Sequence, residues 1–208
     1  MVYEVHCLVV GPFQENTWYV TNEEQQQGVI IDPGEEAERI TSLIEETGTK
    51  PVAIINTHGH LDHIGAVHAL QEAYGLPFYL HPEDHFLIRE YPEHAAMFGV
   101  PMQGLPEVTH SLQEGELTLG GLQWRCLHTP GHTPGGMSFL LNGELFAGDT
   151  LFAGSIGRTD LPGGDTEALL RSIQTKLLEL EESITVHTGH GPDTSIGTEK
   201  RSNPFLRS

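Results

Sequence analysis

Three imidazoles and a carboxylate lie within six residues of this 208-residue chain, in the segment Thr-His-Gly-His-Leu-Asp-His at 57–63. An apolar, strand-like run precedes the segment. Because side chains two residues apart point the same way from an extended chain, His58 and His60 are placed to bind one cation. A turn then directs Asp62 and His63 toward a second cation. Imidazole and carboxylate are common ligands of divalent metals, so the segment predicts a two-metal site.

Three further candidate ligands lie in glycine-rich turns that follow apolar, strand-like runs. They are His132, Asp149 and His190. Turns of this kind let a side chain at the end of a strand approach a cation closely. Seven protein ligands on two divalent cations, with one carboxylate shared, leave coordination positions for a water molecule. A hydrolytic metal centre needs such an open position.

The order of these motifs resembles the metallo-β-lactamase superfamily, and within it the short, single-domain group of glyoxalase II (hydroxyacylglutathione hydrolase). The superfamily resemblance is carried by H-x-H-x-D-H at 58–63, G-H-T at 131–133, G-D-T at 148–150 and G-H-G at 189–191. The stretches at 148–160 and 203–206 carry the resemblance to the narrower group. The resemblance implies an α/β (α+β) fold, namely a four-layer αββα sandwich that forms one domain over residues 1–208.

The resemblance also implies a role for each ligand. It assigns His58, His60 and His132 to the first metal, Asp62, His63 and His190 to the second, and Asp149 to the bridge between them. These assignments match those that the spacing suggests. Asp32, in the family's first motif, is expected to support the site without binding metal. Zinc β-lactamases that open antibiotics place a cysteine or nothing comparable at the bridge, so antibiotic hydrolysis is not expected.

The activity that the resemblance implies is hydrolysis of a thioester, S-lactoylglutathione or a related 2-hydroxyacylglutathione, by a hydroxide that two cations share. Asp62 is expected to orient this nucleophile. Zinc is the metal we expect, and iron or manganese suits the same ligands. The carboxylates of the glutathione part need cationic partners, for which Arg158, Lys200 and Arg201 are the candidates. Each of the three can also be read as a solvated surface charge.

Two alternatives share the same motifs. Persulfide dioxygenases resemble the chain as well and hold a single iron with two histidines and an aspartate, here His58, His132 and Asp149. A lactonase of the same superfamily is the other alternative. Metal stoichiometry separates the dioxygenase from a two-metal hydrolase.

Composition narrows the possible partners. The formal net charge of −19, from 10 basic and 29 acidic residues, argues against a nucleic-acid partner. A small anionic substrate stays compatible, because two divalent cations add four positive charges locally. No apolar run is long enough to span a bilayer, and the N-terminus lacks the features of a signal peptide, so a cytoplasmic location is expected. The oligomeric state is left open.

The hydrophobic pattern predicts two sheets between layers of helices. Strands are expected at 2–10, 16–21, 28–32, 52–56, 77–80, 122–127, 137–141, 144–147 and 184–187. Helices are expected at 35–47, 63–74, 82–90 and 165–181. The glycine-rich stretch 152–164 is expected to be a functional loop.

Overall fold

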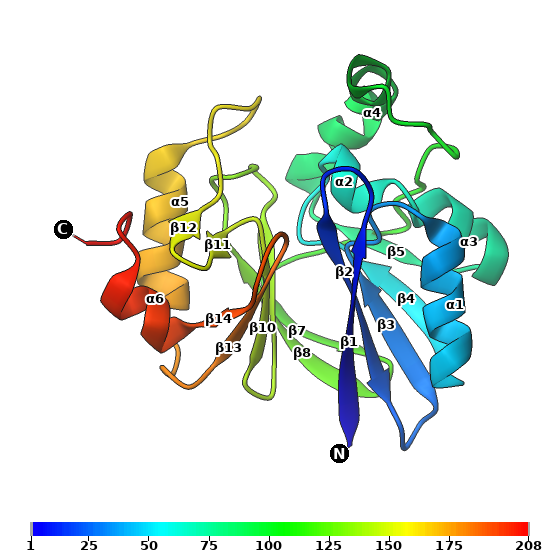
Figure 1. The fold of residues 1–208 in the computed structure, drawn as a ribbon, viewed down its shortest axis with the longest axis horizontal. Helices are drawn as coiled ribbons and strands as arrows, with labels where there is room; N and C mark the ends of the chain where they lie inside the picture. The colour runs from blue at the N-terminus through cyan, green and yellow to red at the C-terminus, as the bar shows by residue number, and fades with distance from the viewer. Residues whose placement is uncertain (1, 208) are drawn as a thin grey trace.

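The computed structural model describes residues 2–207 and contains two six-stranded sheets packed face to face (Figure 1). The first sheet runs in the order β1 (Tyr3–Val10), β2 (Glu15–Asn22), β3 (Gln27–Ile31), β4 (Lys50–Ile55), β5 (Phe78–Leu80) and β6 (His110–Ser111). The second runs in the order β14 (Thr194–Ser195), β13 (Thr185–Thr188), β10 (Glu144–Gly148), β9 (Met137–Leu141), β8 (Leu122–His128) and β7 (Gly115–Leu119).

Helices cover the outer face of each sheet, which confirms the four-layer αββα sandwich (Figure 1). On the first sheet lie α1 (Ala37–Thr47), α3 (Val67–Tyr74) and α4 (His85–Phe98). On the second lie α5 (Thr166–Ser172), the π-helical turn Ile173–Leu177 and α6 (Ile196–Ser202). Among residues 2–207 no helix combines the length and hydropathy that crossing a membrane requires.

Alternation along the strands divides the interior into three apolar layers. In β3, Val29 and Ile31 face the second sheet, whereas Ile30 between them packs under the helices of the first. Trp124 and Phe139 meet the first two residues from the opposite sheet. Successive side chains of a strand point to opposite faces, so a run of apolar residues without polar gaps is what a strand buried on both faces requires. The double burial fixes the register of the strands whose ends carry the site.

Local breaks account for most differences from the expected elements. The helix expected at 63–74 is two helices, α2 (Leu61–Ile64) and α3, because the Ala66 amide donates to the Pro33 carbonyl (3.0 Å) between them. A side chain at Gly65 would also collide with the backbone of Gly34. Helix α4 runs past the expected end at residue 90 and contains Pro92. A proline usually marks a helix boundary, so the sequence favoured an earlier end.

Several short elements were not expected. They are β6, β7, β14, α6 and the hairpin of β11 (Leu151–Phe152) with β12 (Ser155–Ile156). The 3-10 turn η1 (Pro82–Asp84) lies within the helix expected at 82–90. The hairpin occupies the start of the stretch that was expected to be a loop. Strands of two residues carry too little periodic pattern to be recognised in a sequence.

Candidate metal centre

The seven candidate ligands meet at one edge of the two sheets. The segment 57–63 follows β4, His132 lies between β8 and β9, Asp149 follows β10 and His190 follows β13. Strands β10 and β13 are parallel, so their carboxyl ends lie side by side. The fold thus brings together ligands that are up to 132 residues apart, as His58 and His190 are.

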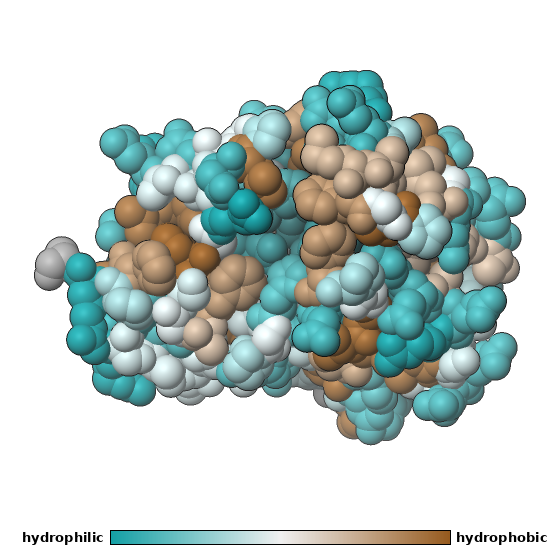
Figure 2. Space-filling view, turned by 45° about the horizontal axis from the view of Figure 1, so that its top comes forward, coloured by the Kyte–Doolittle hydropathy of each residue, from teal (hydrophilic) through white to brown (hydrophobic). Residues whose placement is uncertain are grey.

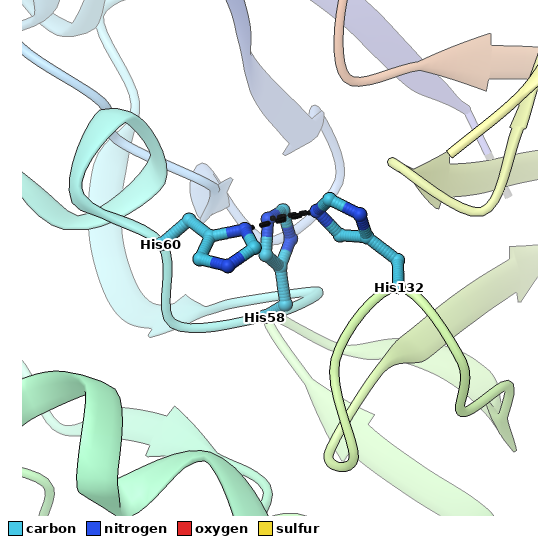
Figure 3. A group of neighbouring side chains, drawn as sticks. All are labelled: His58, His60 and His132. Carbon is cyan, nitrogen blue, oxygen red and sulfur yellow. Dashed lines mark hydrogen bonds between the residues drawn. The ribbon is translucent and has the colours of Figure 1, made fainter. Parts of the chain in front are cut away.

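Three imidazoles form one half of the site, as Figure 3 shows for His58, His60 and His132. His132 Nε2 lies 2.9 Å from His60 Nδ1 and 3.2 Å from His58 Nε2. Nitrogens that bind one tetrahedral cation at about 2.1 Å are roughly 3.3 Å apart. All three side chains are buried. This half therefore has the spacing of a three-histidine metal site.

The second half is formed by Asp62, His63 and His190. His190 Nε2 lies 3.3 Å from Asp62 Oδ2, and His63 Nε2 lies 3.9 Å from the same oxygen. Asp149 stands between the two halves, with Oδ1 3.5 Å from His63 Nε2 and Oδ2 3.5 Å from His132 Nε2. Asp149 Oδ2 is also 3.7 Å from His190 Nε2. The Asp149 carboxylate is thus placed to contact a cation in either half.

Two buried polar atoms at the centre of the site have no hydrogen-bond partner among the described residues. They are Asp149 Oδ1 and His63 Nε2. A buried polar atom left unpaired costs about 1–3 kcal/mol. The two atoms are 3.5 Å apart in the second half, so a cation beside them would satisfy both. The three histidines of the first half offer a separate group of donors, so the donor set fits two divalent metals.

Acceptors behind His58 and His63 set the tautomers of these rings. The Thr57 hydroxyl donates to Asp32 Oδ2 (2.6 Å), so its oxygen accepts the proton of His58 Nδ1 (3.0 Å). His63 Nδ1 donates to the same Asp32 oxygen (3.1 Å). Both rings, when neutral, therefore present the lone pair of Nε2 to the site. Asp32 also accepts from the Thr57 amide (2.7 Å) through its other oxygen, so it holds the start of the segment that carries the ligands.

Backbone carbonyls fix the tautomers of His132 and His190. His132 Nδ1 donates to the Arg158 carbonyl (2.7 Å), and His190 Nδ1 donates to the Phe13 carbonyl (3.1 Å). A carbonyl only accepts, so the proton is on Nδ1 and Nε2 is free to bind metal. The Asn16 side chain holds the turn around His190 by donating to the Thr188 and Gly191 carbonyls (3.0 and 2.9 Å).

The two halves differ in protonation. Burial and the neighbouring imidazoles lower the pKa of His58 well below its usual value and that of His60 to about 3. Burial also acts against protonation of His63, but the Asp149 and Asp62 carboxylates outweigh it and raise the His63 pKa. The pKa of His190 is raised in the same way, against burial, chiefly by Asp62. His58 and His60 are therefore neutral near pH 7, whereas His63 and His190 would have to release protons when that half binds a metal.

The Asp149 carboxylate stays ionised although it is buried. Burial by itself raises its pKa, but the nearby imidazoles, above all His63, more than offset this and hold the pKa below the usual range. A carboxylate that remains charged in this position supplies the anionic ligand that two adjacent cations require.

Asp84 supports the site, although no pattern in the sequence singles it out. Its fully buried carboxylate accepts from the Gly59 amide (3.1 Å), between two ligands, through Oδ2. The Thr133 hydroxyl donates to the same oxygen (2.8 Å), and the Gly135 amide donates to Oδ1 (2.7 Å). One side chain therefore holds both loops that carry the three-histidine half. In the sequence, an acidic residue at the start of a helix is commonplace.

The candidate substrate-binding cations are placed differently from one another. Arg158 lies beside the site and its carbonyl accepts from His132, but its exposed guanidinium is paired with Asp160 (2.7 and 2.8 Å). Lys200 donates to the Leu178 carbonyl (3.3 Å), and Arg201 donates to Glu182 (2.8 Å).

Leu178 and Glu182 precede β13, so they lie at the end of that strand opposite to His190. The structure therefore does not bring Lys200 or Arg201 to the histidines. Their closeness to His190 in sequence is misleading because α6 packs back along the sheet.

Two histidines close to ligands in sequence have other partners. His128 Nε2 donates to the Pro134 carbonyl (2.9 Å). His187 lies between the Asp193 and Glu144 carboxylates (2.9 and 2.8 Å). Neither ring joins the group of ligands.

Fold and site together define a class of protein. The sequence profile of the metallo-β-lactamase superfamily matches residues 10–190, and the chain belongs to this superfamily of metallo-hydrolases. The chain is 45% identical to the hydroxyacylglutathione hydrolase GloC of Haemophilus influenzae over 210 residues, which cover 98% of each protein.

Solved structures with the same fold are similar over nearly the whole chain. One is the BLEG-1 B3 metallo-β-lactamase, with 39% identity, a TM-score of 0.93 and coverage of 99% of this chain and 100% of that one. Another is TTHA1623 in a di-iron-bound form, with 44% identity, a TM-score of 0.90 and coverage of 97% and 100%.

Proposed function

We propose that the protein is a two-metal thioester hydrolase of the glyoxalase II type, acting on S-lactoylglutathione or a related 2-hydroxyacylglutathione. The observation that carries the proposal is the position of Asp149 between the two groups of ligands, within 3.7 Å of a nitrogen in each. The similarity to a hydroxyacylglutathione hydrolase over the full chain supports the same substrate class. The partner is thus a small anionic thioester and not a nucleic acid.

The metals are proposed to be two divalent cations, zinc by preference. Iron remains in the proposal because TTHA1623 is known in a di-iron-bound form. His58, His60 and His132 would hold one cation, Asp62, His63 and His190 the other, and Asp149 both. When bound, the cations supply Lewis acidity, which lowers the pKa of water and stabilises the oxyanion that develops on the substrate carbonyl.

The side chains of the chain itself perform the remaining tasks. Asp62 is partly exposed, so one of its oxygens can accept a proton of the attacking water while the other faces His190. This contact would orient the water toward the thioester carbonyl. The thiolate leaves without a general acid, because its own pKa is low compared with that of an alkoxide. Arg158, beside His132, is proposed to bind a carboxylate of glutathione. Its guanidinium would leave the ion pair with Asp160 and pair with the substrate carboxylate instead.

The test is hydrolysis of S-lactoylglutathione by metal-replete protein, followed as loss of thioester absorbance. Wild-type protein should turn over the thioester, and Asp62→Asn should lower kcat much more than it changes KM. Glu38→Gln, at an exposed position of α1 away from the site, is the matched control. No turnover by metal-replete wild type would refute the proposal.

A second candidate is β-lactam hydrolysis, which the aspartate at the bridge position disfavours but which the similarity to the BLEG-1 metallo-β-lactamase supports. The same preparations should be assayed on a chromogenic cephalosporin. If the kcat/KM for the cephalosporin exceeds that for S-lactoylglutathione, β-lactam hydrolysis replaces the thioester proposal.

A further inference from the structure

Two exposed aromatic side chains lie together next to the metal site. Phe13 is in the turn between β1 and β2, and Phe98 ends α4. Their ring centroids are 5.7 Å apart with an interplanar angle of 81°, an edge-to-face pair. Both remain accessible, at 38% and 56% exposure. Figure 2 shows brown and pale-brown atoms gathered over this turn and α4, next to a hollow in the surface.

Hydrogen bonds fix the position of Phe13 relative to the ligands. The Phe13 carbonyl accepts from His190 Nδ1, and the Asn16 amide donates to the Gly189 carbonyl (2.8 Å). The turn itself is closed by Gln14, whose amide donates to the Gly11 carbonyl (3.1 Å). An aromatic ring on so short and so well-bonded a turn is held in place at the edge of the metal site.

A third aromatic ring approaches the same ligand. Phe152, in the β11–β12 hairpin, has its ring centroid 6.4 Å from that of His190. The second half of the metal site therefore opens between apolar side chains that come from both halves of the sandwich.

The opposite side of the site is polar. Arg158 and Asp160 lie beside His132, in the first half of the site, and pair with each other there. The surroundings of the two halves of the site thus differ. Charged groups lie on the His132 side, and aromatic groups lie on the His190 side. A substrate that is charged at one end of its thioester and apolar at the other matches this asymmetry.

We propose that Phe13 and Phe98 form a subsite for an apolar acyl group, so that the enzyme prefers 2-hydroxyacylglutathiones whose acyl part carries an aryl or branched alkyl group. The inference rests on the proposed function and adds the acyl class to it. The acyl group is the occupant because the glutathione part is polar and charged and suits the Arg158 side. Burial of an aryl ring against two aromatic rings gains hydrophobic and edge-to-face stabilisation that the methyl group of lactate lacks.

The test compares S-mandeloylglutathione with S-lactoylglutathione, which differ only in a phenyl for a methyl group. Wild-type kcat/KM should be at least about tenfold higher for the mandeloyl substrate. In Phe13→Ala and Phe98→Ala this ratio should fall several-fold, and Phe98→Leu should restore part of it. Met97→Ala, at a neighbouring position that is 71% exposed, is the matched control and should keep the wild-type ratio.

Three results would overturn the subsite. Equal kcat/KM for the two substrates in the wild type would do so, as would variants that lower both values by the same factor. The third result concerns a phenyl thioester of lactate. If its turnover depends on Phe13 and Phe98 while turnover of the mandeloyl substrate does not, the two rings bind the thiol part of the substrate and not the acyl part. Hydrolysis of neither glutathione thioester would overturn the proposed function together with the subsite.

Discussion

Replacing Asp84 should weaken one metal site and spare the other. The Asp84 carboxylate accepts from the Gly59 amide and the Thr133 hydroxyl through Oδ2 and from the Gly135 amide through Oδ1. In Asp84→Asn one oxygen becomes an NH2 group. Whichever way the amide is turned, one backbone amide, that of Gly59 or of Gly135, then faces a donor.

The magnitude follows from that single unpaired amide. A buried donor without an acceptor costs about 1–3 kcal/mol. If the loops relieve this cost by moving, His58, His60 and His132 lose their alignment. Loss of a group that orients metal ligands typically lowers metal affinity by about 10–100-fold. Among residues 2–207, Asp84 forms no hydrogen bond or ion pair with Asp62, His63 or His190, so that half should keep its affinity within about threefold.

The assay is titration of metal-free protein with Zn²⁺ against a chelator of known affinity, which resolves the two dissociation constants. Glu83→Gln, an exposed neighbour of Asp84, is the control and should leave both constants unchanged. Equal weakening of the two sites, or no change at either, would refute the role given to Asp84. Asp84→Ala is a poorer test, because three unpaired donors threaten the fold itself.

Two further predictions concern pH and substrate binding. Because His63 and His190 have raised pKa values, a metal must displace their protons, so affinity at that half should fall as the pH is lowered from 8 to 6. The affinity of the other half, where the pKa of His58 is lowered and that of His60 is about 3, should change much less, and equal pH slopes in Zn²⁺ titrations would contradict this. Arg158→Ala should raise KM for S-lactoylglutathione several-fold more than it lowers kcat, whereas Lys200→Ala should be silent in the same kinetics. An unchanged KM for the Arg158 variant would leave that residue as a surface charge.

The ligands were accessible to sequence reasoning because each lies within a few residues of a strand end. The segment 57–63 combines a strand signal with closely spaced donors, and His132, Asp149 and His190 follow apolar runs through glycine-rich turns. Such signals are local, and the structure brings these seven candidate ligands together. The alternation of apolar residues likewise predicted the longer strands and the layers.

What sequence reasoning missed depends on contacts between distant segments. Asp84 accepts hydrogen bonds from the Gly59 and Gly135 amides, which lie 25 and 51 residues away in the sequence. No residue near Asp84 in the sequence indicates these partners. The break between α2 and α3 is set by the Pro33 carbonyl, which lies outside the helix. Lys200 follows His190 closely in sequence, yet α6 carries it to the other end of β13. Each of these features depends on tertiary contacts, which a single sequence does not reveal.

Asp149 is the group on which the account depends most. It is the ligand within reach of both halves, so Asp149→Ala should weaken both metal sites together, whereas His132→Ala or His190→Ala should empty mainly one. The decisive measurement is the metal content of metal-replete Asp149→Ala together with its rate on S-lactoylglutathione. The wild type should hold two metals per chain, and the variant should hold fewer than one and hydrolyse the thioester at least about 10³-fold more slowly. An Asp149→Ala protein that keeps two metals and hydrolyses the thioester at near wild-type rates would contradict this expectation.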